Sequence, residues 1–334
     1  MERFDFSKKL FFHPERILKI KNGERPFPLT VEIDLTDVCN HRCVFCFTPK
    51  DDKDGKRTLK TDRVLKLLDE LWEMGTRGIS FTGGGESMLH KDFKLIADRA
   101  KDIGFDLGLM TNGSMLIDVD LINRDFQWVR ISMSGGNSEI YNKVQGVNHF
   151  ELVVKNIKNL CSKKKKDLVV GIRMLVNETN IKSVKDMINT FEDSGITYIQ
   201  FAADQFAKKD ITMGYKFKKI LRDISTKLKI HTQGYEIEQD KAFPQKCYAH
   251  YFQGVVNAKG EILFCKNCRN SNKYRIGNIY DNSLQEIWEG EIVKNLEASI
   301  TPYNCGLFCK NSKLNNTMQE ILYPDNSIQP NFVN

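Results

Sequence analysis

Long apolar runs are missing from this chain of 334 residues, and so is the short apolar core of a secretory signal peptide. The longest apolar stretches are too short to cross a bilayer, which argues against a membrane protein. The first residues, MERFDFSKKLFFHPER, mix charged and aromatic side chains and contain no signal-peptide core. These absences predict a soluble protein of the cytoplasm.

The sequence also lacks the signs of a disulfide framework and of nucleic-acid binding. The nine cysteines are an odd number, and eight of them fall into two groups, at positions 39–46 and 247–309. Grouped cysteines in a cytoplasmic chain indicate metal or redox chemistry rather than disulfides. The formal net charge is +7, and Lys163 to Lys166 form one basic run. No interleaved aromatic residues accompany that run, so nucleic acid is not expected as a partner.

The chain is rich in alternating strand and helix patterns. Residues 62–74, for example, repeat apolar side chains at helical spacing. Strands are predicted at 31–35, 78–81, 105–110, 128–133, 168–175 and 196–201, and helices at 62–74, 91–103, 116–123, near 150–161 and at 181–194. Strands separated by helices predict the α/β class, with a parallel sheet and right-handed crossovers that curl it into a barrel or part of one.

Three cysteines with the spacing CxxxCxxC directly follow the first predicted strand: Cys39, Cys43 and Cys46. Thiolates are the usual protein ligands of iron–sulfur clusters, and a [4Fe–4S] cube has four irons. Three thiolates therefore leave one iron open to bind a small molecule. A zinc site with His41 as a fourth ligand is the alternative, although structural zinc more often uses two separated pairs of ligands.

These cysteines, with Phe45 just before the last of them, resemble the radical S-adenosylmethionine (SAM) superfamily. The resemblance implies an open (β/α)6 partial barrel of the TIM type, with Phe45 at the cofactor site. It implies that the open iron binds SAM, and that one electron splits SAM into methionine and a 5′-deoxyadenosyl radical. That radical abstracts a hydrogen atom from the substrate. In such enzymes the cofactors supply the chemistry and the protein positions them.

The turn after the second predicted strand, Thr82-Gly83-Gly84-Gly85-Glu86, is the next candidate. In barrels, residues at the carboxyl ends of strands form the active site. Consecutive glycines also let the backbone approach a ligand closely. In the family a glycine stretch that ends in Glu contacts the amino group of SAM. The resemblance therefore assigns Gly84, Gly85 and Glu86 to the cofactor.

Three later strands add further candidates. Ser132 lies at the end of the fourth strand as a possible SAM contact, and Arg173 lies inside the apolar fifth strand. An arginine there requires an acidic partner, which is either the SAM carboxylate or a neighbouring carboxylate of the protein. Gln200 and Asp204, near the end of the sixth strand, are placed to face the substrate.

The second cysteine group contains Cys247, Cys265, Cys268, Cys305 and Cys309. Its spacing, a Gly-Asn-Ile segment and a helix that Ser283 begins resemble the auxiliary-cluster extension of radical SAM enzymes. This extension is called twitch in its short form and SPASM in its long form. Five cysteines fit the short form with one additional cluster. We therefore assign a second [4Fe–4S] cluster to four of them: Cys247, Cys265, Cys305 and Cys309.

Cys268 is then left over. It is a candidate hydrogen-atom donor to a substrate radical, a replacement ligand or an inert thiol, and the first role would make it catalytic, like Asp204. Cys161 stands alone on an apolar helical side and is expected in the core.

The predicted organisation follows from these motifs. It is a lead-in at 1–28, a radical SAM partial barrel at 29–205, a connecting helical segment at 206–243, an auxiliary-cluster domain at 244–315 and a polar tail at 316–334. Pro14–Lys21 is predicted as a short helix in the lead-in, and 213–228 as a helix that covers the barrel.

The expected activity is hydrogen abstraction from a small carbohydrate or aminocyclitol, because no dedicated peptide-recognition domain precedes the barrel. Two-electron oxidation, with the auxiliary cluster as electron acceptor, is preferred. The alternatives are an epimerase that uses Cys268 and an enzyme that modifies peptides. An external one-electron donor such as flavodoxin or ferredoxin is implied as partner. A cluster-bearing scaffold that does not turn SAM over, and an RNA-modifying enzyme, are further possibilities.

Overall fold

The structure, a computed structural model, describes residues 6–46, 48, 57–116, 118–203, 211–233, 246–266, 269, 271–301 and 311–324. One sheet of ten strands runs through it. The strands are β1 Thr30–Asp34, β2 Gly78–Thr82, β3 Asp106–Thr111, β4 Phe126–Ser132, β5 Val169–Val176, β6 Tyr198–Ala203, β7 Ile230–Gln233, β8 Gln253–Val256, β9 Glu261–Leu263 and β10 Arg275–Asn278.

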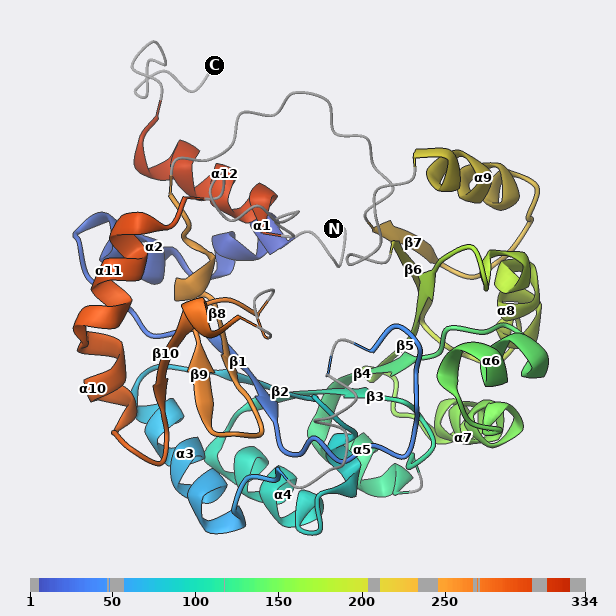
Figure 1. Cartoon of the computed structure of the whole chain (residues 1–334), viewed down its shortest axis with the longest axis horizontal. Coiled ribbons are helices and arrows are strands. Elements are labelled where there is room, and N and C mark those ends of the chain that lie inside the picture. The colour runs from blue at the N-terminus through green and yellow to red at the C-terminus, as the bar shows by residue number, and fades with distance from the viewer. Residues whose placement is uncertain are drawn as a thin grey trace.

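The described helices lie mainly on the outer side of this sheet (Figure 1). They are α1 Phe6–Lys9, α2 Pro14–Lys21, α3 Thr61–Glu73, α4 Phe93–Ile103, α5 Val119–Asp125, α6 Ser138–Gln145, α7 Phe150–Lys163, α8 Val184–Phe191, α9 Ile211–Arg222, α10 Leu284–Glu289, α11 Glu291–Ser299 and α12 Ser312–Leu322. Among the residues described, no helix combines the length and the apolar character that a bilayer crossing requires.

The strand order is β10-β9-β8-β1-β2-β3-β4-β5-β6-β7. Strands β1 to β7 are parallel to their neighbours, and the sheet curves so that β7 and β10 are its two edges (Figure 1). Each of the six predicted strands is present within two residues of its predicted bounds. The predicted α/β class with a partial barrel is therefore confirmed.

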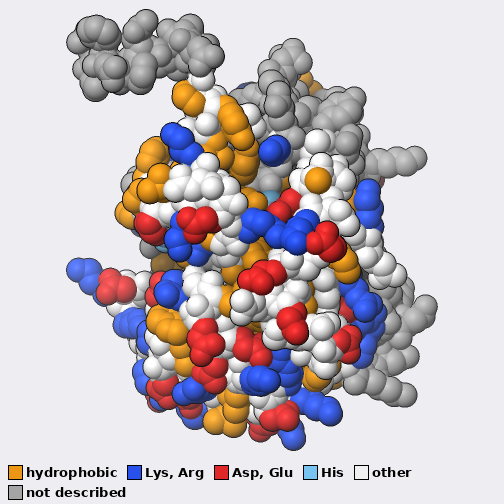
Figure 2. Space-filling view, turned by 90° about the vertical axis from the view of Figure 1, so that its left-hand side faces the viewer, with side chains coloured by type: hydrophobic (Ala, Val, Ile, Leu, Met, Phe, Trp, Pro, Cys, Tyr) orange, Lys and Arg blue, Asp and Glu red, His pale blue; other side chains and the backbone are white. Residues whose placement is uncertain are grey.

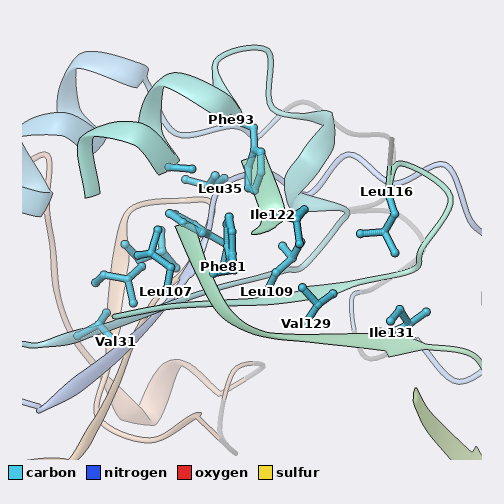
Figure 3. Packing of buried hydrophobic residues seen from close by; sticks show 14 of the residues in the cluster. Val31, Leu35, Phe81, Phe93, Leu107, Leu109, Leu116, Ile122, Val129 and Ile131 are labelled. Carbon is cyan, nitrogen blue, oxygen red and sulfur yellow. The ribbon is translucent and has the colours of Figure 1, made fainter. Parts of the chain in front are cut away.

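The main core lies between the outer side of the sheet and the helices. Alternate strand residues such as Val31, Leu107 and Val129 point outward and pack against residues such as Phe93 and Ile122 (Figure 3). Because side chains alternate along a strand, the intervening residues face the barrel interior. The same alternation that builds the core therefore brings polar residues from several strands into one interior.

Two glycines make room for aromatic rings inside the barrel. A Cβ atom on Gly108 would lie 2.1 Å from the ring of Trp128, and one on Gly171 would lie 2.1 Å from the ring of Tyr198. Trp128 is on β4 beside Gly108 of β3, and Tyr198 is on β6 beside Gly171 of β5. Large rings on alternate strands thus fill the interior below the ends of the strands, where the polar residues lie.

The auxiliary segment belongs to the same sheet as the barrel. Strand β8 pairs with β1 in parallel, and β8, β9 and β10 form an antiparallel meander. The predicted helix that Ser283 begins is present, and Ser283 forms a capping box with Glu286. Strand β1 therefore carries the barrel on one side and the auxiliary segment on the other.

The two ends of the described chain pack together. Leu10, Tyr248, Phe252, Leu314 and Met318 form a second apolar cluster in which α1 meets α12 (Figure 1). Residues 316–334 were predicted as a polar tail, but α12, Ser312–Leu322, extends into this segment and buries one side of the helix. This segment is rich in Asn and has few apolar residues, so the sequence showed no helical periodicity there.

Charge is mixed on the face that includes α10 and α11. Figure 2 shows acidic and basic side chains interspersed there, with apolar side chains between them. The exposed apolar residues include Phe11, Leu18 and Ile292. On this face the excess positive charge does not gather into a single basic field of the kind that nucleic acid requires.

An arginine from the auxiliary segment enters the barrel interior. Arg269 forms ion pairs with Glu32 and Asp34 of β1 and donates a hydrogen bond to the Thr82 hydroxyl of β2, at 3.2 Å. Lys266 lies 3.8 Å from the Glu32 carboxylate. Burial raises the pKa of Asp34, and the opposing effect of Arg269 is smaller. Burial would also raise the pKa of Glu32, but Lys266 and Arg269 together lower it below its usual value.

We predict that Arg269→Met destabilises the folded protein by about 3 kcal/mol or more, because two largely buried carboxylates lose their partner. Their pKa values would then rise, so the loss shrinks as they become protonated at lower pH. The difference in apparent Tm between wild type and variant should be larger at about pH 8 than at about pH 5.5. A difference that is equal at both pH values, or larger at the lower one, would contradict this assignment.

Candidate active site

The cysteine loop lies at the carboxyl end of β1 and is held by the end of helix α6. The Arg42 amide donates to the Gln145 carbonyl at 3.0 Å, and the Val44 amide donates to the Val144 carbonyl at 2.9 Å. Gly146 ends α6 in the left-handed region, with φ 70°, and a Cβ atom there would lie 2.5 Å from the Arg42 carbonyl oxygen. Helix α6 escaped prediction because its eight residues contain few apolar positions.

All three thiols of this loop are partly buried. Cys39 Sγ accepts hydrogen bonds from the His41 amide at 3.5 Å and from Asn112 Nδ2 at 3.9 Å. Cys43 Sγ donates to Gln145 Oε1 at 3.7 Å, and the Cys46 amide donates to the Cys43 carbonyl at 3.3 Å. Burial raises the pKa of the Cys39 thiol. Iron would therefore have to displace its proton, as metal binding to cysteine does generally.

The glycine turn after β2 is joined to the chain just before the cysteines. The Gly85 amide donates to the Thr36 carbonyl at 3.0 Å, and the Glu86 amide donates to the Val38 carbonyl at 2.8 Å. A Cβ atom on Gly84 would lie 2.0 Å from Asp37 Oδ1, and one on Gly85 would lie 2.1 Å from the Val38 carbonyl oxygen. Glycine is required here because two backbones meet, whatever else the turn contacts.

Glu86 is buried at the end of this turn and is 2% exposed. Its carboxylate accepts from Thr111 Oγ1 at 2.9 Å, from the Asn112 amide at 2.7 Å and from the Met88 amide at 3.4 Å. Burial raises the pKa of Glu86 against these hydrogen bonds. A carboxylate has about four acceptor positions, so about one remains for a further donor. Glu86 thus fixes the turn after β3 and can still accept one hydrogen bond from a ligand.

An amide network that sequence reasoning missed connects the β3 turn to the cysteine loop. Asn112 Nδ2 donates to Asn40 Oδ1 at 2.8 Å, and Asn40 Nδ2 donates to Ser114 Oγ at 2.8 Å. Ser114 Oγ donates in turn to Asn112 Oδ1 at 2.7 Å. The Thr111-Asn112-Gly113 turn was visible in the sequence, but its partner Asn40, 72 residues away, was not.

His41, the fourth ligand of the zinc alternative, is engaged elsewhere. It is 1% exposed, and its ring nitrogens lie 3.4 Å from Gln145 Nε2 and 3.3 Å from His149 Nδ1. Burial, with a smaller contribution from His149, lowers the pKa of His41 to about 4. Within the described ranges, no three His, Cys, Asp or Glu side chains gather closely enough to hold a single metal ion. Since both of its ring nitrogens have partners, His41 is not placed as the fourth ligand of a zinc ion.

A row of polar side chains crosses the barrel interior at the ends of β4 to β7. Ser132 pairs in register with Arg173, Arg173 with Gln200, and Gln200 with His231. The Ser132 side chain is exposed, whereas Gln200 is 4% exposed and its Oε1 has no hydrogen-bond partner among the described residues. The strand register thus places Ser132, Arg173 and Gln200 side by side, as the sequence alone could not show.

No carboxylate among the described residues is the acidic partner that was expected for Arg173. Its Nε is buried without a hydrogen bond, and no carboxylate of the described chain lies within ion-pair distance of it. Burial, and then the neighbouring Arg130, lower the pKa of Arg173 to about 10, so it stays cationic at neutral pH. A buried cation without an acidic partner is costly, which makes an anionic ligand the expected partner.

The auxiliary cysteines are described only in part. Cys247 and Cys265 are partly buried and pack against the core, and Asn315 Nδ2 lies 4.0 Å from Cys247 Sγ. Asn315 Oδ1 accepts from the Tyr248 and Ala249 amides, so α12 fixes the chain that follows Cys247. Four predicted site residues lie outside the described residues: Asp204, Cys268, Cys305 and Cys309.

The structure also locates Phe45 and Cys161. Phe45 is a partly buried residue of the cysteine loop, and Cys161 is partly buried against the core on α7. The described cysteines are Cys39, Cys43, Cys46, Cys161, Cys247 and Cys265, and all are free thiols.

Two family models match the chain. The radical SAM superfamily model matches residues 33–225, and a model of the SPASM iron–sulfur cluster-binding domain matches residues 247–311. The first covers more than half of the chain and the second follows it closely. Together they imply [4Fe–4S] clusters and SAM as cofactors.

Curated relatives are distant. The Fe-coproporphyrin III synthase of Methanosarcina barkeri is 24% identical over 70% of this chain and 58% of its own length. The subtilosin biosynthesis protein AlbA of Bacillus subtilis is 24% identical over 84% of this chain and 64% of its own length. The probable GTP 3′,8-cyclase of Thermococcus kodakarensis is 27% identical over 72% and 80%. The chain thus spans less than two thirds of the first two of these proteins.

Solved structures share the fold. Streptococcus suis SuiB bound to its precursor peptide SuiA aligns with 92% of this chain and 75% of its own, at a TM-score of 0.69 and 15% identity. The enzyme anSMEcpe with bound SAM and a peptide aligns with 86% and 88%, at a TM-score of 0.60 and 19% identity. At such identities the likeness establishes the arrangement of barrel and auxiliary segment.

We predict that Gly85→Ala displaces the cysteine loop, because the added methyl group would collide with the Val38 backbone. The reconstituted variant should hold about half the iron of the wild type, losing the barrel cluster and keeping the auxiliary one. Gly78→Ala, at the start of the strand that leads into this turn, is the matched control, since its Cβ would meet only the Thr30 side chain, at 3.1 Å. Full iron content in Gly85→Ala would show that the loop does not depend on this contact.

Proposed function

The chain belongs to the radical SAM superfamily, and from this premise we propose that it is an enzyme that abstracts hydrogen from a peptide substrate. When bound, the cluster and SAM supply a 5′-deoxyadenosyl radical at the mouth of the barrel. Cys39, Cys43 and Cys46 would hold the cluster, and α6 and the glycine turn would keep their loop in place. The protein itself would orient SAM and the substrate and exclude water from them.

Three residues are proposed to orient SAM. Arg173 would pair with its carboxylate, and the exposed Ser132 hydroxyl beside it in register would donate to the same group. The remaining acceptor position of Glu86 would receive the SAM amino group. Gly84 and Gly85 would act through the position of Glu86, since Gly84 lies against the Asp37 side chain and Gly85 against the Val38 backbone.

A peptide is preferred over a carbohydrate as substrate because of the named functions of the relatives. SuiB is described with a bound precursor peptide, anSMEcpe with a bound peptide, and MftC as a mycofactocin maturase. The match to SuiB, which extends through the barrel and the auxiliary segment, is the observation that carries this preference. None of the relatives named here is described with a carbohydrate or an aminocyclitol as its substrate.

The reaction proposed after hydrogen abstraction is oxidation. The substrate radical would lose a proton and a second electron, and Cys247 and Cys265 would help to hold the acceptor of that electron. Epimerisation, with Cys268 as the hydrogen donor, is the alternative. An external donor such as flavodoxin or ferredoxin would supply the first electron. Because the described cysteines are free thiols, we place the enzyme in the reducing cytoplasm.

The first test concerns SAM cleavage. The reconstituted wild type, reduced anaerobically with dithionite, should release 5′-deoxyadenosine and methionine from SAM, and Cys39→Ala should release neither. Cys161→Ala, which removes a lone thiol from α7, should behave as the wild type. A wild type that binds both clusters and SAM but releases no 5′-deoxyadenosine would point to the scaffold function instead.

The second test separates oxidation from epimerisation in heavy water. Oxidation should give a peptide product two hydrogens lighter than the substrate, with no deuterium at an inverted carbon. An unchanged mass apart from one deuterium at an inverted carbon would establish the epimerase. In that case Cys268→Ala should stop product formation while 5′-deoxyadenosine is still released, and mass spectrometry of the digested peptide measures both outcomes.

A further inference from the structure

The charged residues of the barrel interior are distributed unevenly. On the β1 side, Glu32 and Asp34 are paired with Lys266 and Arg269 of the auxiliary segment. These two carboxylates therefore have cations of their own. Glu32 also interacts electrostatically with Arg130 and Arg173 across the interior, but it forms an ion pair with neither.

On the β4 and β5 side, the two interior arginines, Arg130 and Arg173, have no such partners. Neither forms an ion pair with any carboxylate in the described part of the chain. Arg130 contributes to the lowered pKa of Arg173. Among the described residues, the interior thus holds two arginines with no carboxylate at ion-pair distance.

Arg130 lies one row deeper than the residues proposed to bind SAM. It is two positions before Ser132 on β4 and pairs in register with Gly171, whereas Ser132 pairs with Arg173. Its Nη2 lies 3.0 Å from Met110 Sδ, a weak acceptor, and its guanidinium lies 5.8 Å from the Trp128 ring centre. These contacts hold the side chain in place, and no carboxylate among the described residues pairs with its remaining donors. Gly171 beside it has no side chain, and the Tyr198 ring packs against Gly171.

We propose that Arg130 forms a carboxylate-binding subsite in the barrel interior, and that the substrate peptide carries a carboxylate beside the residue that is modified. This inference rests on the proposed function, in which the SAM carboxylate occupies Arg173 and leaves Arg130 for the substrate. The carboxylate belongs either to an Asp or Glu side chain or to the free end of the peptide. A guanidinium binds both in the same bidentate manner.

The experiment measures peptide binding to the reconstituted, SAM-bound enzyme under anaerobic conditions, without reduction. Three fluorescent pentapeptides serve as probes: Ala-Ala-Glu-Ala-Ala with both ends blocked, the same peptide with Gln at the centre, and the Gln peptide with a free carboxyl end. The wild type should bind one of the two acidic probes about 10- to 100-fold more tightly than the blocked Gln peptide. The identity of that probe shows which carboxylate is recognised.

Three variants test whether Arg130 is responsible. Arg130→Met should abolish the preference for the acidic probe, and Arg130→Lys should retain part of it, because lysine keeps the charge but not the planar fork. Arg77→Met is the matched control, since the Arg77 guanidinium lies 4.1 Å from the Trp72 ring centre on the exposed surface and its loss removes the same charge. It should keep the wild-type preference.

The subsite is overturned if the wild type binds all three probes equally or binds none of them, or if Arg130→Met keeps the preference. Release of 5′-deoxyadenosine by the reduced wild type is measured in the same preparation. Release without a preference for acidic probes rejects the subsite alone. A preference without release rejects the proposed radical function and leaves Arg130 as a carboxylate-binding residue.

Discussion

Two hydrogen bonds between neighbouring turns position the whole cysteine loop. The amides of Gly85 and Glu86 donate to the carbonyls of Thr36 and Val38, so the ends of β1 and β2 continue beside each other past the sheet. This approach is possible only because Gly84 and Gly85 have no side chains. From there Glu86 holds the β3 turn, and Asn112 of that turn reaches Asn40 and Cys39. The first three strand ends are thereby joined into one rigid cradle for the thiols.

The barrel interior combines this cradle with an asymmetric charge distribution. Trp128 and Tyr198 fill the space that Gly108 and Gly171 leave, so the polar residues collect in the rows nearest the strand ends. Glu32 and Asp34 are paired with cations of the auxiliary segment, whereas Arg130 and Arg173 form no ion pair with any described residue. A buried charge without a partner destabilises a fold, and it is commonly retained where a ligand supplies the partner. The interior is therefore suited to anionic groups, of which the SAM carboxylate is one.

The auxiliary segment is tied to the barrel by more than a linker. Strand β8 pairs with β1, Arg269 reaches the β1 carboxylates, and α12 packs on the N-terminal helices. Movement of the auxiliary segment would therefore disturb β1, the strand that leads into Cys39. This connection places Cys247 and Cys265 in the same packed unit as the strand that leads into the cysteine loop.

The sequence by itself determined the fold class, the family and the main cysteine loop, because these depend on local spacing. Helical periodicity such as Val64, Leu67, Leu68 and Leu71 needs no distant partner, and neither does CxxxCxxC. The sequence did not reveal α6, β7, α11 and α12. These segments are short or polar, and tertiary packing rather than a local pattern stabilises their secondary structure. Only the tertiary structure decided which residues surround the thiols and which charges are left without partners. Gln145 meets Cys43 across 102 residues, and Arg269 meets Asp34 across 235. Pairings at such separations follow from the strand register and the curvature of the sheet, which no local pattern encodes.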